Sequence, residues 1–347
     1  MEAINQIKTS EKKSIHFGLD LNGGQLKLFT SPLGSFLNGR RLSFTVEQFE
    51  DLDAKLESTG NFLQKNRDSL PKKFEVTPCL SFTDVLIRSL RIPKTSPKEI
   101  MNILKWELSE TIEFSLETHQ LRYIYIGEMK ERQGTRDEYL VFLTANSVIQ
   151  KYTDFFEQYN IKAFGLDFEG LAITRFLKNY SEIASLTHES VGIINIGQST
   201  SSFQILRNNQ LAFMKSIKYG SKDFDTFYGD LLNFNSEETK KWRIVIEQSE
   251  KISQETIGFI EQSQVKATEP LKNFISSCMR YFSGSFRGEY VQQIFITGDL
   301  SNFQGLTQTL SESTGASITK PTLPNIDYDL STWAQVIGQS LKQRANL

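Results

Sequence analysis

Apolar and polar residues alternate one by one near the start of the chain, from Ser14 to Leu21. A period of two places successive side chains on opposite faces of a strand. Adjacent glycines at 23–24 follow and predict a tight turn, because glycine adopts positive φ angles at little steric cost. Residues 25–30 alternate again and are expected to form the partner strand. The pattern predicts a hairpin with one carboxylate, Asp20, just before its turn.

A similar pattern returns in the middle of the chain, in residues 192–206, GIINIGQSTSSFQIL. A buried strand, a turn and a second strand follow one another, and Asn195 occupies the place of Asp20. The two hairpins begin the two halves of the chain, about half its length apart. This internal repeat predicts two duplicated lobes that face a common cleft.

The spacing of apolar residues predicts further helices and strands. Helical spacing predicts helices over residues 47–70, 146–160, 171–180 and 302–315, with mostly polar helical sequence over 221–283. Apolar runs predict strands over 85–90, 121–129, 138–145, 211–218 and, as the last clear strand, 290–298. The segment RNNQ at 207–210 predicts a hairpin turn before the strand over 211–218. Ser96 is expected to cap a helix with Pro97 at its first position and Glu99 three residues after the cap. Residues 78–145 thus predict an αββ-like insertion.

Composition and charge narrow the class of protein. The chain has 347 residues, of which 39% are hydrophobic, so a large core can form without disulfides. Lys and Arg total 39 against 41 Asp and Glu, with no long block of either sign, which argues against binding of nucleic acid through gross charge. No apolar run approaches the roughly 18 residues that span a bilayer, and the first residues lack the apolar stretch of a secretion signal. A cytoplasmic protein that reaches the membrane only through partners is expected.

Familiar catalytic motifs are absent from the sequence. The two cysteines and three histidines form no cluster with metal-ligand spacing. There is no GxxxxGK[ST] phosphate loop, no GxSxG elbow and no protein-kinase signature. The sequence therefore gives no ground for expecting an enzyme of those classes.

Four segments follow one another along the chain: GLDLNGGQLKLF, KEIMNILKWELSETIEFSLE, DFEGLAITRFL and WAQVIGQSLK. Together they resemble the PilM family of type IV pilus assembly proteins, actin-like relatives of the division protein FtsA. The hairpin GLDLNGGQLKLF is similar to the family's GIDIGSSSVKLV. The segment KEIMNILKWELSETIEFSLE resembles its E-x-x-x-AIRWEAEQYIPFPLE and keeps the pair Trp106-Glu107. DFEGLAITRFL matches D-x-E-P-L-A-L-x-R-x-L, and WAQVIGQSLK is similar to the family's closing helix. The resemblance covers nearly the whole chain.

This resemblance implies an α/β, actin-like fold of two lobes with an inserted αββ subdomain in the first lobe. Residues 1–77 and 146–185 would form the first lobe, and residues 78–145 the inserted 1C-type subdomain. Residues 186–347 would form the second lobe, with 221–283 as its smaller helical subdomain.

The family also implies a nucleotide site. In actin-like relatives such hairpin turns hold phosphates, and acids at the strand ends organise hydrated Mg²⁺. Here Asp20 would be the acid on the Mg²⁺ side, and Glu169 the carboxylate that polarises the attacking water. ATP or ADP would contact Asp20 and the residues of three turns, namely Asn22, Gly23, Gly24, Lys27, Asn195, Gly197, Gln198, Ser199, Thr200, Gly298 and Asp299. Plainer interpretations stay open, with Glu169 as a helix-start acid and Lys27 as a solvated strand lysine.

Three departures from the family pattern lower the expected affinity for nucleotide. Asn195 replaces the second acid and carries no charge for Mg²⁺. The serine-rich first turn has become Asn-Gly-Gly-Gln, and the adenosine turn, usually A-G-G-G, is Thr-Gly-Asp-Leu at 297–300. Each lost charge-assisted contact costs about 1.5–3 kcal/mol. Nucleotide binding is expected to be weakened or lost, and efficient ATP hydrolysis is not expected.

The function that the resemblance implies is a cytoplasmic scaffold or adaptor of the type IV pilus inner-membrane assembly complex. It would bind the N-terminal tail of a PilN-type membrane protein between the first lobe and the inserted unit, and would couple a pilus motor ATPase to that complex. Nucleotide would act as a conformational ligand. The alternatives are a slowly hydrolysing ATPase, an FtsA-like filament-forming protein, and the cytoplasmic domain of an L-type protein of type II secretion. Homo-oligomerisation is left open.

Overall fold

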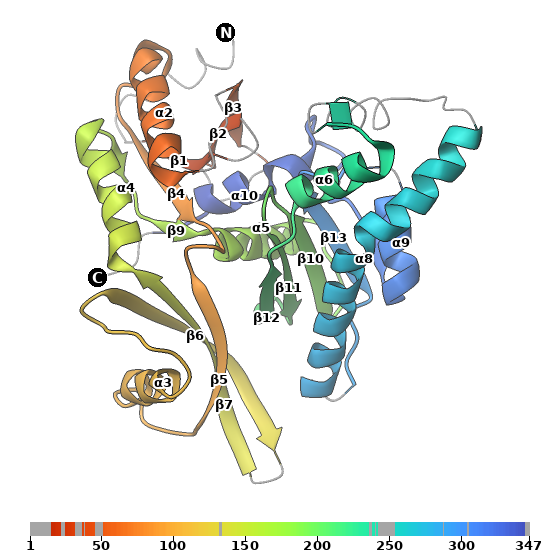
Figure 1. Cartoon of the computed structure of the whole chain (residues 1–347). Helices are drawn as coiled ribbons and strands as arrows, with labels where there is room; N and C mark the ends of the chain where they lie inside the picture. The colour runs from red at the N-terminus through yellow and green to blue at the C-terminus, as the bar shows by residue number, and fades with distance from the viewer. Residues whose placement is uncertain are drawn as a thin grey trace. The chain divides into compact units, whose positions relative to one another are not determined.

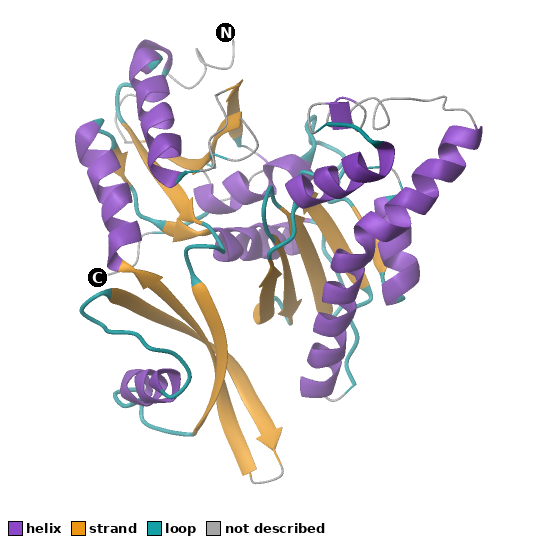
Figure 2. Ribbon diagram, viewed as in Figure 1, coloured by secondary structure: helices purple, strands orange, loops and turns teal. Residues whose placement is uncertain are grey.

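Three β-sheets organise the described part of the chain (Figure 1, Figure 2). The computed structural model describes residues 15–21, 25–31, 37, 39–45, 51–131, 134–235, 238–239, 241, 254–286, 288–303 and 305–343. The chain divides into unit 1, residues 1–34, 39–171 and 342–347, and unit 2, residues 35–38 and 172–341. Two of the sheets belong to unit 1 and the third to unit 2.

The first sheet of unit 1 combines an antiparallel hairpin with parallel strands. Strand β1 (Ile15–Asp20) lies antiparallel to β2 (Gln25–Thr30), and β3 (Arg40–Thr45) pairs with β2. On the other side, β1 pairs in parallel with β4 (Phe74–Leu80), which also pairs with the short strands β8 (Lys162–Ala163) and β9 (Asp167–Phe168). The sheet order is therefore β3-β2-β1-β4-β8, with β9 beside β4.

Two helices of unit 1, α2 (Leu52–Lys65) and α4 (Asn146–Gln158), lie side by side (Figure 1). The ring of Tyr159 fills the space beside Gly60, where a Cβ atom would come within 2.3 Å of the ring. The Tyr152 hydroxyl donates to the carbonyl of Cys79 at 3.0 Å and so ties α4 to the end of β4. A short 3-10 turn, Arg67–Ser69, follows α2.

The second sheet of unit 1 has three strands and one helix. Strand β7 (Gly134–Ala145) lies between β5 (Leu86–Pro93) and β6 (His119–Glu131), and all pairs are antiparallel. Helix α3 (Ile100–Ser109) packs on one face of this sheet, in a core that includes Ile92, Leu104, Leu108 and Val141. The sheet joins the rest of unit 1 through Phe142, whose ring contacts Phe168.

Unit 2 contains one sheet, which has helices on both faces. Its order is β12 (Gln210–Ile217), β11 (Ser201–Arg207), β10 (Ser190–Ile196), β13 (Gln293–Gly298) and β14 (Ser317–Thr319). Helices α6 (Ser221–Leu232), α8 (Gln254–Ser285) and α9 (Leu306–Thr314) share one large core with one face (Figure 1). Helices α5 (Glu169–Ile183) and α10 (Leu330–Ser340) lie on the other face, where the Tyr180 ring contacts Phe295.

The two large sheets repeat one topology. In each, the first strand pairs antiparallel with the second and in parallel with the fourth, so β1, β2, β3 and β4 correspond to β10, β11, β12 and β13. Asp20 lies opposite Lys27 in the first hairpin, and Asn195 lies opposite Ser202 in the second. The acid and the amide that the sequence pattern relates to each other therefore occupy the same position in their hairpins.

Several boundaries differ from those that the sequence pattern predicts. Strand β5 continues through Pro93, because it pairs only with β7 among the described strands and a proline can lie in an edge strand. Helix α3 begins at Ile100 rather than at Pro97, since residues 97–99 form a turn. There the hydroxyl of Ser96 donates to the Glu99 carboxylate at 2.9 Å instead of capping the helix. Strands β3, β4 and β14 are not predicted at all. Strand β3 is largely polar, the apolar run of β4 is interrupted by Glu75 and Pro78, and β14 has three residues.

Other predicted features are confirmed. The polar turn between β11 and β12 forms with Asn208 and Asn209 at φ angles of 49° and 59°. Helix α9 ends before Gly315, which has a φ angle of 71°. Helix α2 begins at Leu52 with the Asp51 carboxylate as its cap, so only the centre of the predicted helix over 47–70 is α-helical in the described residues. None of the described helices combines the length and apolar character needed to cross a membrane.

Candidate functional site

The turn over residues 197–200, between β10 and β11, is fixed by hydrogen bonds to the start of helix α6. Within the turn, the N–H of Gly197 donates to the carbonyl of Thr200 at 2.9 Å. The N–H groups of Ser221 and Lys222 donate to the carbonyls of Gly197 and Gln198 at 2.9 and 3.0 Å. The helix start therefore uses its free donors to hold the turn.

Gly220, just before helix α6, allows this close approach of two backbone segments. A Cβ atom at that position would lie 2.3 Å from the carbonyl oxygen of Gln198, too close for any side chain. The Gly220 N–H donates to the Asp223 carboxylate at 2.8 Å, which satisfies another donor at the helix start. Glycine at position 220 is thus required by packing.

The turn 197–200 keeps donors that could hold an anion. Within the described part of the chain, the N–H groups of Gln198 and Ser199 donate to no protein group. The Ser199 side chain is exposed, and that of Thr200 is half-buried. Successive free N–H groups beside small hydroxyls form a concave, partly positive surface of the kind that binds phosphate oxygens.

A second turn, after β13, lies against the same segment. Gly298 has a φ angle of 89°, and a Cβ atom there would lie 2.2 Å from the carbonyl oxygen of Ile196. The next N–H, that of Asp299, donates to the same carbonyl at 2.7 Å, and the Ser221 hydroxyl donates to the Asp299 carboxylate at 2.9 Å. The structure therefore brings the predicted residues 197–200 and 298–299 together around the start of α6.

Asn195 lies at the end of β10 and is almost fully buried. The Thr297 hydroxyl donates to its side-chain oxygen at 3.0 Å and to the carbonyl of Ile194 at 3.1 Å. This contact orients the amide of Asn195 beside the turn. An amide oxygen can accept a hydrogen bond from a water molecule, but it lacks the negative charge that a divalent cation favours.

In unit 1, Asp20 and Glu169 are both buried and influence each other electrostatically. Glu169 is the first residue of α5, and one of its oxygens accepts from the N–H of Phe82 at 2.6 Å. Burial raises the pKa of the Glu169 carboxyl to about 7, and the negative charges of Asp20 and Asp84 contribute to this rise. A carboxyl group with such a pKa can accept and release a proton near neutral pH.

The structure gives less information on the other residues of unit 1 that are predicted to bind nucleotide. Lys27 is half-buried in β2, opposite Asp20. Asn22, Gly23 and Gly24 lie outside the described residues. The described part of the chain contains no group of three acidic, histidine or cysteine side chains placed to hold a metal ion.

The fit to a nucleotide with Mg²⁺ is therefore uneven. The turns of unit 2 present donors that suit phosphate oxygens, whereas Asn195 at the end of β10 brings no negative charge for the cation. When bound, Mg²⁺ would neutralise phosphate charge. The residues fit the anion better than the cation.

Two contributors to these sites escape the sequence reasoning. Asp84 is close enough to Glu169 to raise its pKa, but nothing in the sequence distinguishes Asp84 from other loop acids. The segment 220–221 packs against the turn 197–200 and donates to it through the N–H of Ser221. The pattern of a glycine followed three residues later by Asp223 could have marked a helix start there.

Comparisons with known proteins give a consistent result. The family model described as "Type IV pilus assembly protein PilM" matches residues 47–345. A structure titled "PilM-PilN type IV pilus biogenesis complex" is 16% identical, with a TM-score of 0.71, and the match covers 94% of this chain and 97% of that one. The comparison with curated protein sequences gave no match.

Two further structures share the fold at lower similarity. Ethanolamine utilization protein EutJ from Carboxydothermus hydrogenoformans is 10% identical with a TM-score of 0.53, and the match covers 98% of this chain and 95% of that one. MreB5 of Spiroplasma citri, in a structure with bound AMPPNP, is 11% identical with a TM-score of 0.50, over 94% of this chain and 95% of that one. These likenesses bear out the predicted actin-like α/β fold.

Proposed function

Because the chain belongs to the PilM family of type IV pilus assembly proteins, we propose that it is an adaptor that binds the N-terminal tail of a PilN-type membrane protein. The observation that carries this proposal is the likeness to the protein of the PilM-PilN complex, which extends over 94% of this chain. In that complex the homologous protein is assembled with PilN. The same task for this chain would place it at the cytoplasmic face of the inner membrane.

The three-stranded sheet of unit 1 offers a place for such a tail. Strand β5 pairs only with β7 among the described strands, so its other edge can accept a further strand. An extended peptide added to this edge would gain main-chain hydrogen bonds, and its alternate side chains would lie on the two faces of the sheet. We therefore place the tail along β5, beside the segment 81–85 that connects this sheet to β4.

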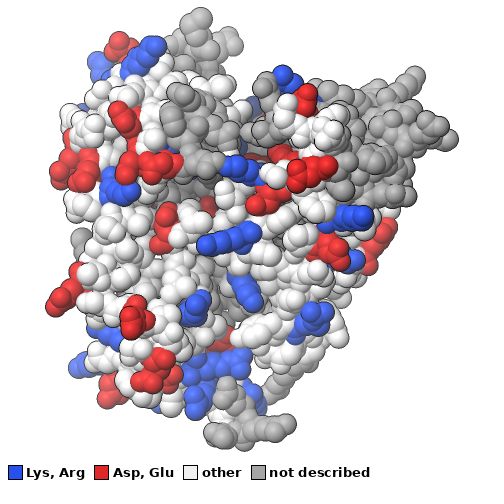
Figure 3. Space-filling model, in the orientation of Figure 1, with Lys and Arg blue, Asp and Glu red and all other residues white. Residues whose placement is uncertain are grey.

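Charge at the surface supports a protein partner rather than a nucleic acid. Figure 3 shows both basic and acidic side chains on the face drawn, with one group of basic side chains toward the bottom of the view. The chain as a whole has a formal net charge of −2. Nucleic-acid binding commonly relies on a basic stripe or patch, because neutralising phosphates supplies most of the affinity. Membrane contact would come through the bound tail, and a pilus motor ATPase would be the second partner.

Nucleotide has a secondary role in this proposal. The donors of turn 197–200 support weak binding of ATP or ADP phosphates, while Asn195 removes one charge-assisted contact. ATP would then shift a conformational equilibrium through its differential affinity for two states and would not be turned over efficiently.

A slow ATPase is the second candidate, and Glu169 is the observation that favours it. Its carboxyl has a pKa of about 7 and could assist the attack of water. Phosphate release from purified protein with ATP and Mg²⁺ separates the two candidates. Turnover faster than about 1 s⁻¹, the low end of the enzyme range, would contradict the adaptor proposal. A lower rate that is unchanged in Glu169→Gln would exclude this residue as a base.

Peptide binding tests the adaptor proposal directly. A fluorescent peptide with the N-terminal tail sequence of a PilN-type protein from the same genome is titrated with the full chain and followed by anisotropy. We expect a Kd of about 10 μM or tighter, and a scrambled peptide should not bind. Failure of the native peptide to bind would contradict the adaptor function.

Backbone methylation of the peptide tests the site without altering the protein. Methyl groups are placed on alternate peptide amides in one version and on the intervening amides in a second version. Along a strand, successive N–H groups point to opposite sides, so only one version blocks the amides that face β5. We expect one version to lose binding and the other to keep it. Equal effects of the two versions would contradict addition of the tail as a strand.

A further inference from the structure

A pocket in unit 2 lies at the opposite ends of the strands from turn 197–200. It has a volume of about 320 Å³, in the range of small-ligand sites. The end of α5, the connection to β10, the first residues of β10 and the turn after β11 line it. Its principal side chains are Glu182, Leu186, Glu189, Val191, Leu206 and Asn209.

The pocket lining contains two carboxylates, Glu182 and Glu189. The Asn209 side-chain N–H donates to the Glu182 carboxylate at 2.6 Å, which fixes the orientation of the amide. In the described part of the chain, the buried oxygen of the Asn209 amide has no hydrogen-bond partner, and neither has the buried hydroxyl of Ser181, another lining residue. These two atoms are closed to solvent, and a buried polar atom without a partner is costly.

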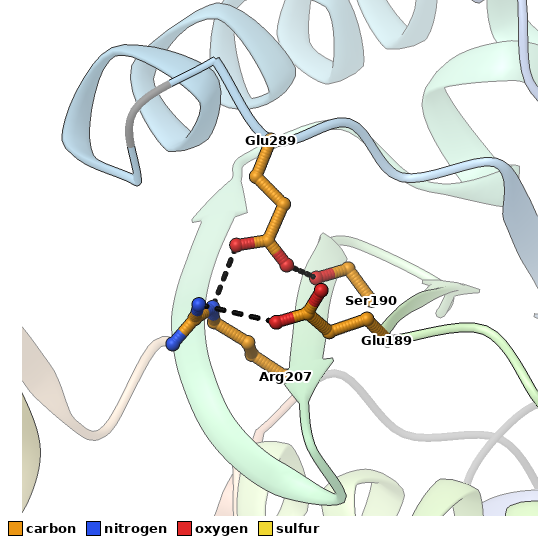
Figure 4. Close-up of polar contacts among 4 residues, drawn as sticks. All are labelled: Glu189, Ser190, Arg207 and Glu289. Atoms are coloured by element: carbon orange, nitrogen blue, oxygen red, sulfur yellow. Dashed lines mark hydrogen bonds and ion pairs between the residues drawn. The ribbon is translucent and has the colours of Figure 1, made fainter.

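The second carboxylate, Glu189, is held at the rim by a neighbouring ion-pair cluster (Figure 4). The Arg207 guanidinium contacts Glu189 at 3.2 Å and Glu289 at 2.6 Å, and the Ser190 hydroxyl donates to Glu289 at 2.6 Å. Arg207 also lies over the ring of Phe286, at 5.6 Å from its centre. The positive charge of Arg207 therefore interacts with Glu289 and with the ring of Phe286 as well as with Glu189.

The remaining surface favours a cation with an aliphatic stem. Val191 and Leu206 are buried, and Leu186 is half-buried, so one wall of the pocket is apolar. The pocket also adjoins the C-terminal end of the 15-residue helix α5, where the helix dipole is negative. His188 is the single basic side chain of the lining, against Glu182 and Glu189.

We propose that this pocket binds an alkyl guanidinium or alkyl ammonium group. The cationic head would donate to Glu182 and Glu189, and the methylene stem would lie along Leu186, Val191 and Leu206. The group belongs either to a free small amine or to an arginine or lysine side chain of a partner protein. The site is independent of the turns 197–200 and 298–299, since it lies at the other end of β10.

Titration of the full chain with agmatine tests this proposal. We expect saturable binding by calorimetry with a Kd of about 1 mM or tighter, and shifts of the methyl signals of Val191 and Leu206 in the NMR spectrum. Propionate, an anion of similar stem, should cause neither effect. No saturable agmatine binding, or equal binding of propionate, would overturn the proposal.

Three variants test whether agmatine binds in this pocket. Glu182→Gln should weaken agmatine binding at least about tenfold, because it removes a charge-assisted contact. Glu312→Gln is the matched control, since Glu312 also lies on a surface helix of unit 2 and accepts an amide hydrogen bond, from Gln308 at 2.9 Å. Equal effects of both variants would overturn the proposal. Ser181→Lys places an ammonium group of the chain itself at the pocket and should abolish binding while the circular dichroism spectrum stays unchanged.

A second ligand separates the two sources of the cation. N-acetyl-arginine N-methylamide carries the same guanidinium on a blocked peptide unit. If it binds as tightly as agmatine and loses affinity in Glu182→Gln, the pocket accepts the side chain of a partner protein. If only agmatine binds, the pocket is specific for a free amine. Either result supports the proposed chemistry, whereas binding that is insensitive to Glu182→Gln contradicts it.

Discussion

Glu169 allows the sharpest test of the electrostatics in unit 1. Its carboxyl has a pKa of about 7 in the folded protein, against an ordinary value of 4.5, chiefly because it is buried. Between these two values the folded state binds a proton that the unfolded state has released. The free energy of unfolding therefore falls as pH rises through this window, by about 1.4 kcal/mol per pH unit. Over the whole window the loss amounts to about 3 kcal/mol.

Replacement by glutamine removes this titration but preserves the shape of the side chain and its capacity to accept from the Phe82 N–H. We expect Glu169→Gln to be about as stable as the wild type at pH 5. At pH 8 it should be more stable than the wild type by about 3 kcal/mol, because the wild type must then bury a charge. The difference in free energy of unfolding between Glu169→Gln and the wild type should increase progressively between these pH values.

Urea unfolding at half-unit pH steps, followed by circular dichroism, gives the stability difference directly. Glu117→Gln is the control, since Glu117 is an exposed acid of the same unit. Its difference from the wild type should not change with pH by more than a few tenths of a kcal/mol, as is usual for surface sites. A stability difference for Glu169→Gln that stays constant from pH 5 to pH 8 would refute the reasoning.

Three further substitutions, and one control, test other parts of unit 2. Asn195→Asp places an acid beside turn 197–200 and should tighten the binding of Mg²⁺–ATP at least about tenfold. The affinity for ATP without metal should not increase, and calorimetry measures both affinities. Gly298→Ala should destabilise the protein by more than about 2 kcal/mol in thermal or urea unfolding, because residue 298 has a φ angle of 89° and a Cβ atom there would clash with the backbone. The control is Gly284→Ala on the open surface of α8, which should stabilise the protein by about 0.5–1 kcal/mol. Tyr180→Phe should cost about 1–3 kcal/mol in the same assay, because the buried hydroxyl bonds both the N–H and the carbonyl of Thr322.

Each of these expectations has a result that would contradict it. Equal tightening of ATP with and without Mg²⁺ in the Asn195 variant would mean that the new carboxylate does not act on the cation. Similar stabilities of the two glycine variants would show that the turn after β13 can relax. A Tyr180 variant as stable as the wild type would mean that water replaces the lost hydroxyl.

The sequence predicts the repeated hairpins well, because their signals are local. Alternating apolar residues and glycine turns determine β1 with β2 and β10 with β11, and the equivalence of Asp20 with Asn195 follows from spacing alone. The turn at Asn208 and Asn209 is predicted for the same reason, since both residues tolerate positive φ angles. Local sequence patterns therefore predict the hairpins that contain Asp20 and Asn195, two residues of the proposed nucleotide site.

Features that depend on distant contacts escape this reasoning. Strand β14 has three residues and is stabilised by pairing with β13, which no local pattern reveals. The raised pKa of Glu169 depends on Asp84 and on burial, and neither can be read from the residues that adjoin Glu169 in the sequence. The pocket beside Glu182 is likewise formed by three segments whose proximity only the folded sheet creates.

The divergence of the two hairpins bears on how nucleotide could act in this protein. Moving a two-state equilibrium from 1:99 to 99:1 requires a ligand that prefers one state by about 5.5 kcal/mol. Replacement of an acid by Asn195 removes one charge-assisted contact, about 1.5–3 kcal/mol of the interaction that a Mg²⁺–nucleotide could contribute. The backbone donors of turn 197–200 remain, but they act on phosphate in either state unless the turn itself changes. Nucleotide alone would then be a weak switch, and under the proposed function contacts with the tail along β5 would supply the larger part of any conformational preference.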